Sequence, residues 1–118
     1  MESMQMKRGE IYFAVLDPTI GSEIKKQRPV LIISNDANNN AAATLTVIPL
    51  TSKTEKVYPF EVLLNRKDSG LMKPSKAQCQ QIRTISKLRI RGKRVGIVNK
   101  NIIMKIEKAL KLHLDFID

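Results

Sequence analysis

Apolar and polar residues alternate along several short segments of the chain, a pattern typical of β-strands. Residues 10–16 predict a first strand, with Ile11, Phe13 and Val15 on one face and the even-numbered residues on the other. Further strands are predicted over residues 30–33, 44–50, 60–64 and 75–82. Residues 17–22 break the pattern, and Pro29 marks the entry to the next strand. The asparagine-rich segment 35–40 is typical of a loop.

The segment that follows predicts a basic hairpin. Residues 87–91 alternate so that their basic side chains share one face, with Leu88 and Ile90 on the other. We expect a turn at Gly92 and a second strand over residues 95–98 that pairs with residues 87–91.

The period then changes to that of a helix. Apolar positions recur at spacings of three and four: Ile102, Ile106, Ala109, Leu110, His113 and Ile117. Asn99 is the predicted N-cap, and the lysines at 100, 105, 108 and 111 fall on the outer side. Many short strands and one terminal helix predict a single domain over 1–118, mainly β with a C-terminal α-helix (α+β), built as a small twisted or closed barrel.

Charge changes this picture by suggesting a partner. The chain has 118 residues and a net charge of +10. Residues 83–111 hold ten basic side chains and one acidic side chain, Glu107. Such a concentrated excess favours a polyanion, because neutralised phosphates release counterions. The alternative is a solvated face that keeps the protein soluble.

Several classes are disfavoured by composition. No apolar run reaches the length of a membrane span, and the N-terminus has no secretory signal, so we expect a soluble cytoplasmic domain. Cys79 is the only cysteine, which excludes an internal disulfide and a cysteine zinc site. We interpret Cys79 as a buried small thiol and His113, the only histidine, as a packing residue.

The remaining candidate chemistry combines an arginine with a hydroxyl. Arg28 stands before a strand, and Thr51 ends the next one. If those strands are neighbours, both side chains reach one rim, where a guanidinium and a hydroxyl suit phosphate oxygens. Spacing alone does not separate this reading from a surface arginine and a turn threonine.

The ordered set of motifs resembles the MazF/PemK family of toxins. The blocks are Met6-Lys7-Arg8-Gly9-Glu10-Ile11-Tyr12, Asp17-Pro18, Gly21-Ser22-Glu23, Arg28-Pro29-Val30, Pro49-Leu50-Thr51, Tyr58-Pro59-Phe60-Glu61-Val62 and Gln81-Ile82-Arg83-Thr84-Ile85. They cover roughly residues 6–117. Residues 1–5 precede them and are expected to be a frayed end or an expression remnant.

The resemblance implies an SH3-like small barrel of the MazF/Kid/CcdB type that forms a homodimer. It also implies a sequence-specific endoribonuclease that cleaves single-stranded RNA in a groove without a metal or other cofactor. The 2′-hydroxyl attacks the adjacent phosphorus and leaves a 2′,3′-cyclic phosphate and a 5′-hydroxyl. A cognate antitoxin with a disordered tail is the implied protein partner; growth arrest, and DNA binding by the toxin–antitoxin complex, belong to the same expectation.

By the same resemblance, Arg28 and Thr51 are the expected catalytic residues, with Glu23 as a candidate general base. Other relatives carry charged catalytic residues in the strand before Gln81, where this chain has the neutral amides Gln78 and Gln80. The expected RNA-binding residues are Ser22, Lys25, Lys26, Gln27, Asn35, Ser52, Lys53, Lys56, Gln78, Gln80, Gln81 and Arg83. Gln78 and Gln80 would share a strand face and read base edges.

Two other functions stay open. Toxins that inhibit DNA gyrase without cleaving RNA share the expected barrel, so the fold alone does not decide. A plain RNA-binding module would account for the basic segment.

Overall fold

A computed structural model describes residues 5–16 and 26–117. The expected chain break at 17–22, Ser22, Glu23, Lys25 and most of the expected frayed end therefore lie outside the described residues. Gln5, the last residue of that end, is described and exposed.

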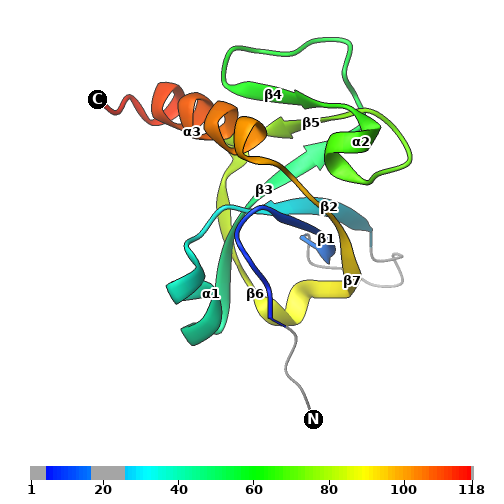
Figure 1. Ribbon diagram of the computed structural model, residues 1–118, viewed down its shortest axis with the longest axis vertical. Coiled ribbons are helices and arrows are strands. Elements are labelled where there is room, and N and C mark those ends of the chain that lie inside the picture. The colour runs from blue at the N-terminus through cyan, green and yellow to red at the C-terminus, as the bar shows by residue number, and fades with distance from the viewer. Residues whose placement is uncertain (1–4, 17–25, 118) are drawn as a thin grey trace.

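Antiparallel pairing joins seven strands into one curved sheet (Figure 1). The strands are β1 Glu10–Val15, β2 Gln27–Ile32, β3 Thr44–Thr51, β4 Glu61–Leu64, β5 Ser75–Gln78, β6 Arg83–Ser86 and β7 Ile90–Ile97. They follow the order β4-β5-β3-β2-β1-β7, and β6 pairs with β3. This path does not close among the described residues, so the expected barrel is a twisted, open sheet.

The sheet is buried on both faces, which gives the domain two cores. Ile11 packs in one core with Leu31 and Ile48, whereas Tyr12 and Val30 pack in the other. The alternation predicted for the first strand is therefore confirmed, but it separates two apolar environments rather than a core from solvent.

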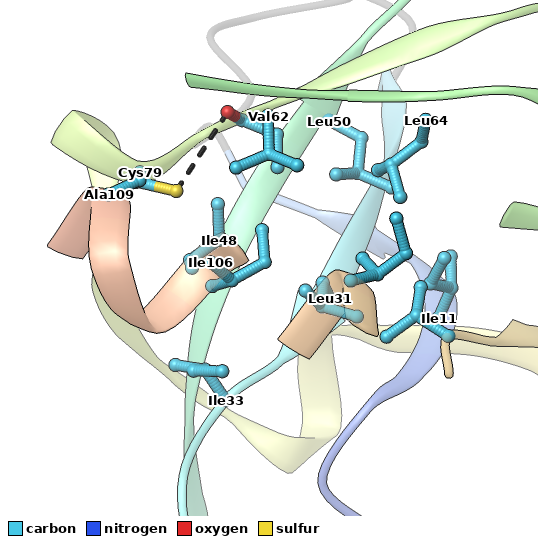
Figure 2. Close-up of a cluster of buried hydrophobic side chains, with 13 residues drawn as sticks. Ile11, Leu31, Ile33, Ile48, Leu50, Val62, Leu64, Cys79, Ile106 and Ala109 are labelled. Atoms are coloured by element: carbon cyan, nitrogen blue, oxygen red, sulfur yellow. Dashed lines mark hydrogen bonds between the residues drawn. The ribbon is translucent and has the colours of Figure 1, made fainter. Parts of the chain in front are cut away.

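Helix α3, Lys100–Leu114, covers the first core at the β4–β5 end of the sheet. The side chain of Asn99 accepts a hydrogen bond from the Ile102 backbone N–H, which confirms the predicted N-cap. Ile106 and Ala109 reach into the space between the helix and the strands (Figure 2). The lysines at 100, 105, 108 and 111 are exposed, as predicted.

The end of α3 differs from the prediction. The helix ends at Leu114, and Asp115 adopts a left-handed conformation with φ of 59°, so Ile117 lies beyond the helix and is 96% exposed. His113 is exposed too, and its ring lies 6.1 Å from that of Phe60. Its expected packing role is therefore limited to that one aromatic contact.

The predicted loop over 35–40 is wrong. Asp36–Ala41 forms the short helix α1, because the Asn35 side chain caps the Asn38 N–H. Asn39 is buried, and its amide donates to the Ser34 carbonyl. The asparagines that suggest a loop are here the cap and the anchor of a helix.

The predicted strand over 75–82 is also wrong in part. β5 ends at Gln78, and the 3₁₀ helix η1, Cys79–Gln81, leads into β6, a strand that the pattern does not reveal. The sequence likewise gives no warning of helix α2, Arg66–Ser69, which an Asn65–Asp68 capping box begins and Gly70 ends.

The predicted hairpin over 87–98 is absent. Lys87–Arg89 forms the 3₁₀ helix η2, and β7 then runs as one strand beside β1. The register shifts between Ile11 and Phe13, which pair with Gly96 and Arg91, so a bulge of residues 92–95 replaces the turn. The basic side chains of 87–91 therefore do not share a face.

The mainly β architecture with a C-terminal helix is confirmed. No helix in the described part of the chain is long and apolar enough to cross a bilayer.

The contact between β7 and α2 generates a stability prediction. A Cβ added at Gly96 would lie 2.2 Å from the Ser69 carbonyl oxygen, so Gly96→Ala forces two backbones apart. We expect a loss of about 3 kcal/mol in the free energy of unfolding. Gly92→Ala meets no atom within 4 Å and bears only the strain of its φ of +77°, about 1–2 kcal/mol. Urea denaturation compares the two; equal losses would contradict the close packing.

Candidate functional site

A cleft lies at one end of the sheet, next to the core that contains Tyr12 and Val30. Val30 and Val47 are buried in that core, and two residues along each strand the same face carries Arg28 and Pro49. One further step along β3 brings Thr51 to this face. The cleft is therefore a polar continuation of an apolar sheet face.

Two prolines open the sheet at this level. The Ile33 N–H donates to the Thr46 carbonyl, so hydrogen bonding alternates along β2 and β3 from that pair. By this alternation the missing N–H of Pro29 is the one that would face β3, where the β2–β3 ladder ends at Val30 and Pro49. The missing N–H of Pro49 is the one that would point away from β2, toward the edge of β3 that pairs with β5 and β6.

That opposite edge of β3 is shared by two strands. β6 pairs with residues 44–47 and β5 with residues 50–51, so Ile48 and Pro49 have no strand partner there. The η1 turn crosses the gap between β5 and β6. Side chains from both sides of the gap thus gather around Pro49.

The cleft has a volume of about 350 Å³ and is strongly cationic. It is lined by Leu16, Arg28, Pro49, Thr51, Lys53, Gln78, Gln81 and Arg83. These described lining residues include three cations and no carboxylate. A small polar recess with this charge suits an anion whose oxygens can accept several hydrogen bonds.

Arg28 and Thr51 meet in this cleft, as the neighbouring-strand condition requires. Arg28 is exposed at the start of β2, and Thr51 is half-buried at the end of β3. The Thr51 Oγ1 atom accepts a hydrogen bond of 3.2 Å from the Lys53 backbone N–H. Because that bond occupies an acceptor site, the hydroxyl proton is free to be donated to a ligand.

Two further arginines fix the cleft's β1 wall. Arg83 Nη2 donates to the Leu16 carbonyl at 3.3 Å, and Arg89 Nη1 donates to the Val15 carbonyl at 3.0 Å. Arg83 therefore both lines the cleft and binds the backbone of its wall, whereas Arg89 binds that backbone without lining the cleft.

Gln80 does not share a strand face with Gln78, and that expectation is wrong. Gln78 ends β5 and lines the cleft, but Gln80 lies in η1, where Nε2 donates to Glu61 Oε2 at 2.8 Å. The Gln80 Oε1 atom is buried. Neither end of this amide is presented to a base.

The other expected RNA-binding residues divide by position. Lys53, Gln81 and Arg83 line the cleft together with Gln78. Asn35 lines a different recess and caps α1, so it is not part of the cleft. Four of the expected RNA-binding residues are exposed but do not line the cleft: Lys26, Gln27, Ser52 and Lys56.

A buried ion pair beside the cleft is absent from the sequence-based prediction. Lys76 and Glu61 are each 7% exposed, and Lys76 Nζ donates to Glu61 Oε1 at 2.8 Å. Burial raises the pKa of Glu61, but hydrogen bonds from Lys76, the Tyr58 N–H and Gln80 outweigh it and hold that pKa below its usual value. No spacing rule reveals the pair, because its members lie on different strands.

Cys79 is buried beneath α3 (Figure 2), as expected. Burial, and secondarily the charge of Glu61, raise the pKa of the thiol to about 12. A thiol in this state is a poor nucleophile, because the reactive species is the thiolate.

Comparison with known proteins agrees with this geometry. Residues 7–114 match the family described as PemK-like, MazF-like toxin of type II toxin–antitoxin system. The chain belongs to this family. It is 45% identical over 115 residues to Endoribonuclease MazF9 of Mycobacterium tuberculosis (strain ATCC 25618 / H37Rv), covering 93% of this chain and 97% of that protein.

Two further matches extend this likeness. Endoribonuclease EndoA of Bacillus subtilis (strain 168) is 37% identical over 116 residues, covering 98% of this chain and 99% of that protein. A mycobacterial endoribonuclease solved in complex with its cognate antitoxin has a TM-score of 0.77 and 26% identity, covering 96% of this chain and 98% of that one.

The raised thiol pKa makes Cys79 testable. We expect native protein at pH 8 to resist iodoacetamide and to react only after unfolding in guanidinium, because the buried thiol stays protonated. Mass spectrometry of the alkylated protein measures this. Labelling of the native chain at the rate seen in denaturant would contradict the buried, protonated thiol.

Proposed function

We propose that this chain is a sequence-specific, metal-independent endoribonuclease toxin that cleaves single-stranded RNA in the cationic cleft. The observation that carries the proposal is the meeting of Arg28 and Thr51 at one rim, within a cleft that also holds Lys53 and Arg83. Membership of the toxin family and the names of the curated relatives support the same activity.

The proposed reaction is an internal transesterification. The ribose 2′-oxygen forms a bond to the adjacent phosphorus while the bond from phosphorus to the 5′-oxygen breaks. The 2′-hydroxyl loses a proton, and the leaving 5′-oxygen gains one. The products are a 2′,3′-cyclic phosphate and a 5′-hydroxyl, with no water or cofactor consumed.

Arg28 stabilises the negative charge that builds on the phosphoryl oxygens. A guanidinium keeps its charge and offers several donors, which also fits proton donation to the leaving oxygen. Thr51 donates its hydroxyl proton to a non-bridging oxygen, in the orientation that its bond from Lys53 N–H leaves free. These roles need positioning rather than covalent attack by the protein.

Glu23 is the proposed base for the 2′-hydroxyl; the alternative is that no side chain removes the proton. The described cleft lining supplies no carboxylate or histidine for this step. Lys53 and Arg83 would hold the RNA backbone, and Gln78 and Gln81 are placed to contact bases. Ser22, Lys25 and Lys26 belong to the segment that flanks Arg28 in sequence, and we assign them to backbone binding.

The proposed setting is a cytoplasmic homodimer held inactive by an antitoxin. Large apolar side chains are exposed on β4 and on the C-terminal part of the chain, including Leu63, Leu112 and Phe116. Surfaces of this kind favour a protein partner. The antitoxin complex solved for the mycobacterial relative supports a partner of that class here.

Arg28→Ala is the first test of the nuclease. With a long, weakly structured RNA in EDTA, we expect kcat/KM to fall by about 10²–10³, the usual effect of removing one donor to a developing oxyanion. Because Arg28 is exposed, the unfolding midpoint should not change. End mapping by sequencing should show 5′-hydroxyl ends at a recurring short motif in the wild type.

Thr51 supplies the matched comparison for this experiment. Thr51→Ser keeps the hydroxyl and should retain cleavage, whereas Thr51→Val keeps the shape and should lose it. Gyrase-dependent DNA cleavage without RNA cuts would favour the gyrase inhibitor instead. Salt-sensitive RNA binding without strand scission would favour a plain RNA-binding module.

The proposed assembly gives a second prediction. Light scattering at micromolar concentration should report a mass near twice the 13.4 kDa of one chain, and added cognate antitoxin should suppress cleavage. A one-chain mass at that concentration would refute the homodimer. Cleavage untouched by a bound antitoxin would refute the inhibitory role.

A further inference from the structure

The buried Lys76–Glu61 pair lies on the cleft side of the sheet. Lys76 is directly opposite Thr51 in the β3–β5 register, and Glu61 is directly opposite Gln78 in the β4–β5 register. Residues opposite one another in an antiparallel pair share a face. Both members therefore stand beside side chains that line the cleft.

The pair ties together segments that are otherwise far apart in sequence. Lys76 Nζ donates to the Lys56 carbonyl at 2.6 Å as well as to Glu61. Glu61 Oε1 accepts from the Tyr58 N–H at 3.0 Å, and Glu61 Oε2 accepts from Gln80. One ion pair thus holds residues 56–58, strand β4 and the η1 turn.

The tied segments include the part of the cleft wall that strand pairing does not hold. Lys53 enters the cleft from the connection between β3 and β4, which has no strand pairing of its own over residues 52–60. Gln81 enters from η1. Arg28 and Thr51, by contrast, stand on β2 and β3, and the Lys76 ammonium bonds the Lys56 carbonyl and Glu61 rather than the Thr51 side chain.

We propose that Lys76 and Glu61 are positioning residues that pre-order the Lys53 side of the cleft for single-stranded RNA. The inference rests on the proposed function. A loop already held in its bound conformation loses less entropy on binding, so the tether strengthens RNA binding more than it accelerates the chemical step. A role in protein stability alone would not raise KM for RNA while leaving kcat nearly unchanged.

The pair is tested by removing both partners together. Loss of Lys76 alone leaves a buried, underpaired carboxylate and endangers folding, whereas joint replacement by neutral side chains of similar volume is often tolerated. In Lys76→Met/Glu61→Gln, we expect KM for RNA to rise about tenfold, as for one lost charge-assisted contact, with kcat changed less than about threefold.

A double-mutant cycle identifies Lys53 as the residue that the tether acts through. Lys53→Ala should raise KM in the wild type and add little in the Lys76→Met/Glu61→Gln background, because residues that act through one another are not additive. Full additivity would overturn the proposal. An unchanged KM in the folded double variant would overturn it as well.

A second ion pair provides the control. Arg94 Nη1 lies 3.0 Å from Glu10 Oε2, a buried carboxylate on β1 that does not line the cleft. Arg94→Met/Glu10→Gln should alter stability but leave KM at the wild-type value. The same rise in KM here would show that the effect is general destabilisation.

A binding measurement separates this inference from the nuclease proposal. The dissociation constant for a mixed-sequence 2′-O-methyl RNA, which has no free 2′-hydroxyl and cannot be cleaved, should rise about tenfold in Lys76→Met/Glu61→Gln, as KM does. A wild type that binds this RNA but cuts no RNA refutes the nuclease alone. A wild type that cuts RNA beside a double variant of unchanged affinity refutes the tether alone.

Discussion

The cleft depends on two missing hydrogen-bond donors on the central strands. Pro29 ends the pairing of β2 with β3, and Pro49 leaves a gap on the other edge of β3 between the regions paired to β5 and β6. A ladder continued through this level would draw the backbones together. Without it, β2 and β3 are unpaired beyond Val30 and Pro49, while their apolar parts stay packed in two cores. The recess is thus a consequence of backbone chemistry, with a rigid sheet behind it.

Side-chain alternation then determines what fills the recess. The face that buries Val30 and Val47 in the second core presents Arg28 and Thr51 once the core ends. The same strand face is therefore apolar in the core and cationic in the cleft, with no change in strand direction. In the proposed function, a phosphodiester in the cleft would meet donors carried by two adjacent strand ends, an arrangement that favours charge stabilisation in a transition state.

The sequence predicted those parts of the structure in which one short segment determines its own geometry. The β1 alternation, the Asn99 cap and the approach of Arg28 to Thr51 follow from local periodicity and from adjacent strands. The bulge at residues 92–95 and the Lys76–Glu61 pair do not, because each depends on partners distant in sequence. The Asn35 cap is local, but asparagine suits turns as well as helix caps, so the pattern did not separate a loop from a short helix. Gln80 is an example: period-two spacing places it beside Gln78, but β5 ends at Gln78 and Gln80 lies in η1.

Charge counting and charge placement give different accounts of this protein. The basic segment 83–111 suggested a polyanion partner, but much of its charge is used internally: Arg89 on a backbone carbonyl, Arg91 on the Leu88 carbonyl and Arg94 on Glu10. Among the described residues of that segment, Arg83 alone lines the cleft. The other cleft cations, Arg28 and Lys53, come from the first half of the chain, where the net charge is small. Three convergent cations in one recess therefore carry the argument for a phosphate ligand better than the total excess does.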